Sequence, residues 1–250
     1  MYDTLTIYGG GNTRAMNEII RKRKSIRNYE LTSLDAGTLE EVQKQIDKAK
    51  PLYGEIQCSV EIVSKTKGLF NTKAPHYLIF RSEEKDGAYE NIGFIGQQLN
   101  LYFAESELGA CWLGASKPID KEKSALPHVI SMAFGKPMEP LYRTLSEFKR
   151  KALNEISEGM DERLDAAQLA PSGMNAQNWY FIADEGNIHC YRKDSGPLLG
   201  FIYNKLSCID IGIALCHIAE ESSDFRFLKE QGVPVRKGLI YIGTVSSRQL

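Results

Sequence analysis

The 250-residue sequence predicts an α+β fold made of two tandem αβ halves, with central helices and mixed sheets. Three observations support this prediction. Helix-like and strand-like segments alternate from residue 17 onward. Segments of the same type recur in the same order in the second half of the chain. Two stretches, 92–109 and 207–222, are apolar on more than one helical face, so we expect them to pack against each other at the centre.

The first half begins with a helix whose start is marked by a capping-box pattern, Thr38 followed by Glu41. The apolar residues that share one face of this helix are Leu39, Val42 and Ile46. The apolar helix at 92–109 ends at a glycine, the residue typical of a C′ cap. Three segments with strand character complete this half: "CSVEIV" (58–63), "HYLIF" (76–80) and "HVISMAFG" (128–135).

The second half repeats this plan, which predicts an internal duplication. The matched pairs of segments are 160–171 with 39–51, 180–183 with 60–63, 210–222 with 94–106, and 239–243 with 131–135. The third pair aligns Gly212 with Gly96, and the segment 143–157 is predicted to be a connecting helix. We expect residues 16–143 and 144–250 to pack as one pseudo-dimer, because a duplicated chain inherits the two-fold interface of its ancestor.

Composition indicates an ordinary folded protein, with 42% hydrophobic and 25% charged residues and a formal net charge of −1. No overall charge directs it to nucleic acid or to a membrane. The five cysteines form no CxxC pair, which suits a reducing cytoplasm, and no apolar run is long enough to span a bilayer. Residues 1–15 match nothing later and are expected to be a leader or extension; the glycines at 9–11 lack the spacing of a dinucleotide fingerprint.

The stretch "RKRKSIRNYE" (21–30) places five cations beside Ser25. Such clusters are often solvated helix ends, and that alternative stays open. In an extended segment, however, Arg23, Ser25 and Arg27 would point to one side while Ile26 packs inward. Guanidinium and hydroxyl groups are donors that suit a phosphate, so the pattern indicates an anion site. Lys24 is the weakest of the basic candidates.

Two further segments have ligand-binding character. "APSGMNAQNW" (170–179) contains Asn175 and Gln177, whose side-chain amides donate and accept hydrogen bonds and so suit the edge of a flat heterocycle. Its alternative interpretation is an ordinary turn that ends a helix. "LGACWLGA" (108–115) follows the central helix, and its glycines let backbone N–H groups approach a planar ligand, although a tight turn is the simpler interpretation.

Together these segments resemble the nitroreductase family of flavoproteins over most of residues 17–245. Members of that family open with an R-x-S-x-R segment, have a P-S-x-x-N-x-Q-P-W loop and a G-x-x-x-W-x-G turn, and carry an arginine beyond a later strand that ends in glycine. The matching residues here are Arg23, Ser25 and Arg27; Pro171, Ser172, Asn175, Gln177 and Trp179; Gly109, Trp112 and Gly114; and Gly135 with Arg143. Asn178 stands where the family usually has proline.

Family members are typically homodimers in which the P-S-x-x-N loop of one subunit reaches the FMN held by the R-x-S-x-R segment of the other. Here the first half keeps the phosphate segment, but its own loop at 50–60 lacks the serine and asparagine of the motif. The second half keeps the loop, but residues 154–162 contain no arginine. The resemblance therefore implies a nitroreductase-like single-chain pseudo-dimer with one intact FMN site, similar to the fused subgroup and consistent with a monomer.

The resemblance also implies which residues bind the cofactor. They are Arg23, Lys24, Ser25, Arg27, Trp112, Leu113, Gly114, Arg143, Pro171, Ser172, Asn175 and Gln177. Arg23, Ser25, Arg27 and Arg143 would face the phosphate or the N1–C2=O side of the flavin, and backbone N–H groups near Leu113 and Gly114 would approach N5.

The implied activity is that of an FMN-dependent oxidoreductase, which passes hydride from NADH or NADPH through the flavin to an electron-poor acceptor such as a nitroaromatic or a quinone. No side chain is required as an acid or base, and the histidines and cysteines predict no metal site. The alternatives are a non-catalytic flavin carrier or sensor, or a dehalogenase-like or flavin-cleaving enzyme. The expected partners are small molecules.

Overall fold

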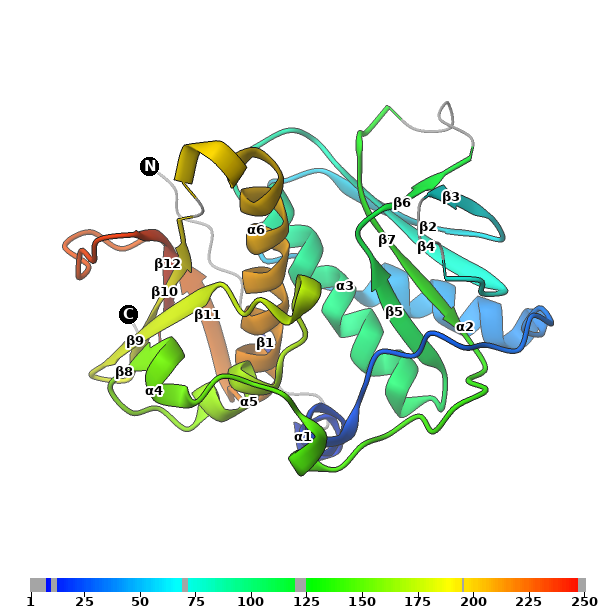
Figure 1. The fold of residues 1–250 in the computed structure, drawn as a ribbon, viewed down its shortest axis with the longest axis horizontal. Helices are drawn as coiled ribbons and strands as arrows, with labels where there is room; N and C mark the ends of the chain where they lie inside the picture. The colour runs from blue at the N-terminus through cyan, green and yellow to red at the C-terminus, as the bar shows by residue number, and fades with distance from the viewer. Residues whose placement is uncertain (1–7, 10–12, 69–71, 120–124, 195, 247–250) are drawn as a thin grey trace.

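The computed structural model describes residues 8–9, 13–68, 72–119, 125–194 and 196–246. Two helices lie at its centre, α3 (Ala88–Glu105) and α6 (Gly196–Glu220), with one β-sheet on either side of the pair (Figure 1). The predicted mixed α/β arrangement around central helices is therefore present. Within the described ranges, no helix combines the length and apolar character needed to cross a membrane.

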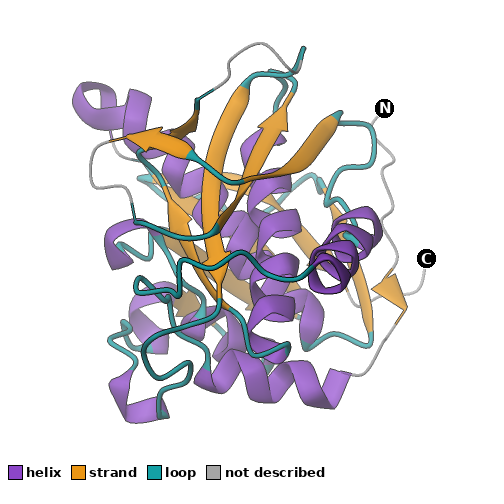
Figure 2. Ribbon diagram, turned by 90° about the vertical axis from the view of Figure 1, so that its right-hand side faces the viewer, coloured by secondary structure: helices purple, strands orange, loops and turns teal. Residues whose placement is uncertain are grey.

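The first half of the chain forms an antiparallel four-stranded sheet in the order β2-β4-β7-β5. Its strands are β2 (Cys58–Val63), β4 (His76–Ser82), β5 (Gly109–Leu113) and β7 (His128–Gly135). Two helices and a small separate ribbon accompany it: α1 (Thr13–Lys22), α2 (Ala36–Lys48), and the paired strands β3 (Thr66–Gly68) and β6 (Ser116–Pro118). Seen from this side in Figure 2, the strands lie in front of the central helices.

The second sheet has the order β1-β11-β12-β10-β9-β8. Its strands are β1 (Tyr8–Gly9), β8 (Ser157–Glu158), β9 (Trp179–Asp184), β10 (Asn187–Lys193), β11 (Asp224–Leu228) and β12 (Leu239–Ser246). Only this sheet is mixed, because β8 runs parallel to β9 while every other pairing is antiparallel. The short helices α4 (Leu153–Ile156) and α5 (Arg163–Leu169) precede β9.

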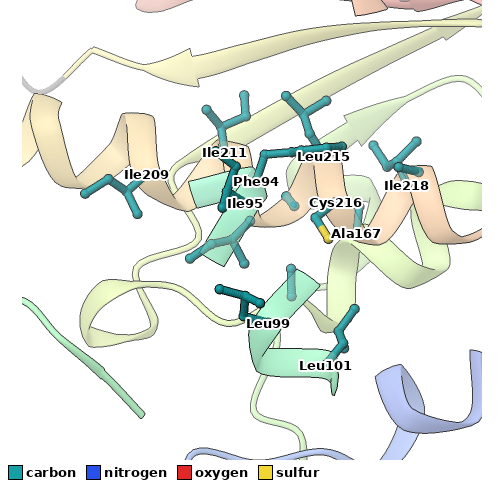
Figure 3. Packing of buried hydrophobic residues seen from close by; sticks show 14 of the residues in the cluster. Phe94, Ile95, Leu99, Leu101, Ala167, Ile209, Ile211, Leu215, Cys216 and Ile218 are labelled. Atoms are coloured by element: carbon teal, nitrogen blue, oxygen red, sulfur yellow. The ribbon is translucent and has the colours of Figure 1, made fainter. Parts of the chain in front are cut away.

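The two central helices pack directly against each other, as the apolar stretches predict. Figure 3 shows the buried side chains between them, among them Phe94 and Leu99 of α3 and Leu215 of α6. The backbones approach closely at two glycines. A Cβ on Gly93 would lie 2.1 Å from the Ile209 carbonyl oxygen, and a Cβ on Gly212 would lie 2.1 Å from the Glu90 carbonyl oxygen. Only glycine permits this separation at either place.

The structure corrects three local predictions in the first half. The N-cap of α2 is Asp35, whose side chain accepts from the Thr38 N–H, so Thr38 lies inside the helix. The helix α3 spans Ala88–Glu105, and the left-handed residue beyond it is Glu107 at φ 59° rather than Gly109. Gly109 instead begins β5, where an added Cβ would lie 2.7 Å from Ile26.

The predicted connecting helix at 143–157 is wrong. That stretch contains a 3-10 turn at Leu145–Glu147 and α4, and the chain between them has no regular secondary structure. Its backbone groups instead bond to the loop that follows α5, as described below. Of the predicted leader, residues 1–7 and 10–12 lie outside the described residues. Residues 8–9 form β1, which pairs with β11, and α1 already begins at Thr13.

Candidate functional site

A cavity of about 510 Å³ lies between the segment that follows α1 and the loop that follows α5. We call it the cationic pocket. The residues that line it are Arg23, Lys24, Ser25, Arg27, Glu139, Arg143, Glu147, Lys149, Arg150, Pro171, Ser172, Met174 and Asn175. Eight of the twelve predicted site residues are therefore brought together in one chain, from segments far apart in sequence: Arg23, Lys24, Ser25, Arg27, Arg143, Pro171, Ser172 and Asn175.

The extended segment Arg23–Arg27 is held on both sides by backbone pairing. Arg23 forms an isolated antiparallel bridge with Tyr142, and the Ile26 N–H donates to the Ala110 carbonyl of β5 at 3.0 Å. Ile26 is fully buried, as its alternation with the polar residues predicts. Residues 23, 25 and 27 all reach the pocket from this segment.

Arg23 is the most desolvated charge of the pocket, with only 1% of its surface exposed. One of its terminal nitrogens, Nη2, donates to Ser25 Oγ at 3.3 Å, but Nε and Nη1 have no partner among the described residues. Burial, together with the neighbouring charges of Arg143 and Arg150, lowers its pKa to about 9. A bound anion would satisfy these N–H groups and offset the repulsion, so the pocket is built for negative charge.

Two carboxylates line the pocket, Glu139 and Glu147, and they offset only part of this positive charge. Arg143 donates from Nε to the Arg23 carbonyl at 3.1 Å, and its guanidinium carbon lies 3.5 Å from the centroid of the Phe148 ring. Glu139 accepts from the backbone N–H of Arg27 at 2.8 Å and lies 3.5 Å from Lys24 Nζ. Glu139 is therefore engaged by the backbone and by Lys24, the weakest of the predicted cations.

The loop after α5 has an unusual backbone. Met174, Asn175 and Gln177 have positive φ angles of 52°, 57° and 49°. For residues other than glycine, each such angle costs about 1–3 kcal/mol and persists only when the surroundings impose it. Two hydrogen bonds help to hold the loop in this conformation. The Gly173 N–H donates to Asp210 Oδ1 of α6 at 2.9 Å, and the Gln177 N–H donates to Ser172 Oγ at 3.0 Å.

The other bonds that hold this loop come from residues 149–151, which the sequence reasoning missed. Arg150 Nη1 donates to Asn175 Oδ1 at 2.6 Å, and Asn175 Nδ2 donates to the Lys149 carbonyl at 2.6 Å. The Lys151 N–H donates to Gln177 Oε1 at 2.8 Å, and Lys151 Nζ donates to the Ala176 carbonyl at 2.6 Å. We call residues 149–151 the clamp segment. The only signal for it in the sequence is the run of three cations.

These bonds give both amides a structural role that the sequence did not indicate. Both polar atoms of the Asn175 side chain already have partners in the clamp segment, although Asn175 lines the pocket. Gln177 is 2% exposed, does not line the pocket, and donates from Nε2 to the Asn175 carbonyl at 3.0 Å. The two amides therefore fix the shape of the loop, and the left-handed backbone is the reason the loop needs them.

Trp112, Leu113 and Gly114, on β5 and immediately after it, do not line the cationic pocket. Leu113 packs in the small cluster around Ile26, and a Cβ on Gly114 would meet Leu206 of α6 at 3.8 Å. The Trp112 indole N–H donates to Gln97 Oε1 at 3.4 Å. Most of the predicted turn is therefore a strand, and none of these three residues lines the cationic pocket.

The Trp112 indole is the first donor of a buried chain that links the two central helices. Gln97 Nε2 lies 2.9 Å from His217 Nε2, and His217 Nδ1 lies 2.8 Å from the Ala166 carbonyl. Since a carbonyl only accepts, His217 must carry its proton on Nδ1, and Nε2 accepts from Gln97. Burial lowers the pKa of His217 to about 3, which keeps the ring neutral. This histidine is a buried structural residue.

The chain matches a family model described as "Putative TM nitroreductase" over residues 15–222. The chain belongs to this nitroreductase family, which confirms the resemblance drawn from the sequence motifs. Family membership supports an oxidoreductase that acts on a small molecule. Among curated proteins, no sequence matches the chain.

One solved structure shares the fold at low sequence identity, and two others are similar over about half of the chain. A "putative nitroreductase" from Thermotoga maritima MSB8 is similar with a TM-score of 0.63 and 18% identity, covering 95% of this chain and 96% of that chain. A nitroreductase family protein from Clostridium difficile 630 has a TM-score of 0.45 and 16% identity, covering 55% of this chain and 94% of its own. An FMN-dependent nitroreductase from Clostridium difficile R20291 has a TM-score of 0.42 and 17% identity, covering 52% and 93%.

Proposed function

We propose that the chain is an FMN-dependent oxidoreductase whose cofactor phosphate binds in the cationic pocket. The observation that carries this proposal is Arg23, a buried guanidinium with two unpartnered nitrogens and further arginines around it. A buried cation without a counter-charge is costly, and it is retained where a ligand supplies the missing charge. A phosphate monoester carries about two negative charges and three acceptor oxygens, which fits these donors.

The pocket suits FMN better than FAD. Its volume of about 510 Å³ lies within the usual range for a small-molecule site. Its arginines form one cluster, Arg23, Arg27, Arg143 and Arg150, which matches a single terminal phosphate. Ser25 and Ser172 add hydroxyl groups to the lining. We therefore expect FMN to bind more tightly than FAD.

When bound, FMN would supply the redox chemistry, accepting hydride from NADH or NADPH and passing it to an electron-poor acceptor such as a nitroaromatic or a quinone. The residues of this chain bind and orient the group. Arg23, Ser25 and Arg27 hold the phosphate, and Arg143 adds positive charge beside them. The strained loop at 172–177 forms the opposite wall.

We also propose that residues 16–143 and 144–250 are two halves of a fused pseudo-dimer, so that one chain is sufficient for the site. The strand orders β2-β4-β7-β5 and β9-β10-β12-β11 have the same connectivity. Each sheet has a register shift between its two middle strands in this order, β4 and β7 in the first and β10 and β12 in the second. The central contact is reciprocal, with Gly93 on Ile209 and Gly212 on Glu90. These contacts favour aligning Gly212 with Gly93, rather than with Gly96 as the sequence match has it.

A second reciprocal feature supports the same proposal. Asn91 of α3 accepts on Oδ1 from the N–H groups of Leu52 and Tyr53 at 2.7 and 3.1 Å. Asp210 of α6 accepts on Oδ1 from the Gly173 N–H at 2.9 Å. In each half, therefore, the central helix holds the loop that follows the preceding helix and its proline. A shared ancestor of the two halves explains both bonds.

The test combines binding with turnover. Titration of the purified protein should show FMN binding well above FAD, and equal or better binding of FAD would contradict the proposed pocket. In anaerobic stopped-flow experiments, NADH or NADPH should bleach the bound flavin, and an acceptor from a nitroaromatic and quinone panel should restore its colour. Flavin that binds but is bleached by neither donor would favour the carrier or sensor alternative.

A further inference from the structure

Arg150 lies in the second half of the chain, outside the segments that match the nitroreductase motifs, yet its guanidinium reaches the cationic pocket. Its Nη1 donates to Asn175 Oδ1 at 2.6 Å and its Nη2 donates to the Leu169 carbonyl at 3.1 Å. Its Nε is buried and has no partner among the described residues. The two terminal nitrogens of Arg150 are thus bonded to the loop and to α5, whereas Nε is a donor without a partner among the described residues.

The surroundings of Arg150 resemble those of Arg23. Burial lowers its pKa to about 10, and the charge of Arg143 lowers it in the same direction. Arg150 in turn lowers the pKa of Arg23. Three guanidinium groups therefore repel one another around one cavity, and a bound anion would reverse the sign of that interaction for all three.

The bond to Asn175 connects this charge to the shape of the loop. Asn175 and Met174 hold left-handed backbone angles that only their surroundings can maintain. The Asn175 side chain is held by Arg150 on one atom and by the Lys149 carbonyl on the other. An anion bound by Arg150 together with Arg143 and Arg23 would fix the Arg150 side chain in place, and with it the bond to Asn175.

We propose that Arg150 is a ligand of the anionic group bound in the cationic pocket and that, through Asn175, it couples occupation of the pocket to ordering of the loop 172–177. This inference rests on the proposed function for the identity of the anion as a cofactor phosphate. The anion-binding part does not require FMN, because inorganic phosphate presents the same oxygens.

The experiment compares Arg150→Gln with Lys149→Gln in the full chain. Both variants remove one positive charge from the pocket lining, but Lys149 is exposed and contributes only its carbonyl to the loop, which the substitution leaves in place. Binding of inorganic phosphate, FMN and riboflavin is measured by calorimetry. Hydrogen exchange of residues 172–177 is measured with and without phosphate. Arg150→Lys is included because it keeps the charge but not the forked geometry.

In the wild type, phosphate should slow hydrogen exchange across the loop. Arg150→Gln should weaken phosphate and FMN about tenfold to a hundredfold, leave riboflavin within about threefold, and abolish the phosphate-dependent protection. Lys149→Gln should retain the protection and lose no more than about threefold in affinity. Arg150→Lys should recover part of the phosphate affinity without restoring full protection.

Two results would overturn the inference. Equal weakening of FMN and riboflavin in Arg150→Gln would make Arg150 a structural support of the loop only. Unchanged phosphate binding in Arg150→Gln would remove it from the anion site. Failure of the proposed function looks different, because the wild type would then bind phosphate with loop protection but would show no preference for FMN over riboflavin.

Discussion

The loops after α2 and α5 hold equivalent places in the two halves but have different contents. Each follows a short helix and begins with a proline, Pro51 or Pro171, and each is bonded to the central helix of its own half through Asn91 or Asp210. The loop after α5 borders the cationic pocket. In the loop after α2, Tyr53 is directed inward and packs edge-on against Phe227, with ring centroids 5.8 Å apart.

The sheet edges beside these loops differ in the same way. The exposed edge of β5 receives the segment Arg23–Arg27, through the bond from Ile26 to Ala110. The corresponding edge of β11 receives β1, where Tyr8 pairs with Phe225, and residues 5–13 of the sequence contain no lysine or arginine.

The inward position of Tyr53 in the loop after α2 depends on Gly87. This glycine, at φ 87°, makes room for Tyr53, because a Cβ there would lie 2.7 Å from its ring.

The fold does not by itself make the site. Strand order, central packing and the bonds between helix and loop occur in both halves, whereas the converging arginines occur beside only one of the two loops in the part of the chain that is described. Backbone architecture supplies two places where a ligand could be held. The side chains determine the outcome: arginines line a pocket beside the loop after α5, whereas Tyr53 packs inward in the loop after α2.

The largest expected effect on stability comes from replacing Asp210, which holds the loop after α5, by asparagine, the residue type that holds the loop after α2. Burial raises the pKa of Asp210 to about 7 from a usual value of 3.8, so the folded state binds more protons between these values and stability falls as the pH rises through that window. Asp210→Asn keeps an acceptor for Gly173 and removes the buried charge. We expect its free energy of unfolding to exceed that of the wild type by about 2–4 kcal/mol at pH 8, with no difference near pH 4.

The reverse exchange, Asn91→Asp, should lower stability at pH 8 and leave it unchanged near pH 4. Its effect should be smaller, because a carboxylate at that position would receive two backbone N–H groups instead of one. Urea denaturation of both variants across this pH range provides the measurement. If Asp210→Asn were less stable than the wild type at every pH, the charge of Asp210 would be needed to hold the loop, and the two loop bonds would not be equivalent.

The next effect separates the buried arginine of the pocket from one outside it. Arg23→Met removes an uncompensated charge and two unpartnered donors while keeping similar bulk. The ligand-free protein should therefore gain about 1–3 kcal/mol of stability, while FMN affinity falls about tenfold to a hundredfold. Thermal unfolding without ligand and FMN titration are the two measurements.

Arg81→Met is the matched control, because Arg81 is also buried, at 3% exposed, but has partners. It donates to Glu61 Oε1 at 3.2 Å and to the Leu126 carbonyl at 3.4 Å. Its loss should destabilise the protein by about 1–2 kcal/mol and leave FMN binding unchanged. Similar losses of stability in both variants would show that Arg23 supports the fold rather than waits for an anion.

Much of the fold could be predicted from sequence because its elements have strong local patterns. The strands at 58–63 and 128–135 have the predicted bounds, and the apolar character of the central helices indicates their position. The helix ends depend on single side chains that compete. Asp35 takes the cap predicted for Thr38, and Glu107 takes the left-handed position predicted for a glycine.

The site was predictable where a motif is contiguous and not where it depends on long-range contacts. The alternation of Arg23, Ser25 and Arg27 can be seen in the sequence, and all three line the pocket. The roles of Asn175 and Gln177 could not be seen, because their partners lie in a segment more than twenty residues away whose own conformation is irregular. Arg150 has no local pattern, and only the folded chain brings it to the loop.

Two variants that each carry one defect in the pocket should not complement each other. Arg27 and Asn175 line the same pocket within one chain, so the proposed pseudo-dimer needs no second copy to complete its site. In a conventional homodimer of this family the two residues would come from different subunits. Arg27→Ala should weaken FMN about tenfold to a hundredfold through the lost charge-assisted bond, and Asn175→Ala should weaken it by releasing the loop from the clamp segment.

The two impaired variants are mixed, unfolded together and refolded, and FMN binding is measured at a concentration that saturates the wild type but neither variant. A homodimer would regain one intact site in each heterodimer, because one subunit supplies Arg27 and the other supplies Asn175. The fused chain cannot, since every molecule carries one defect in its own site. We expect the mixture to bind the average of the two variants, and binding above that average would show that the halves which share the pocket belong to different chains.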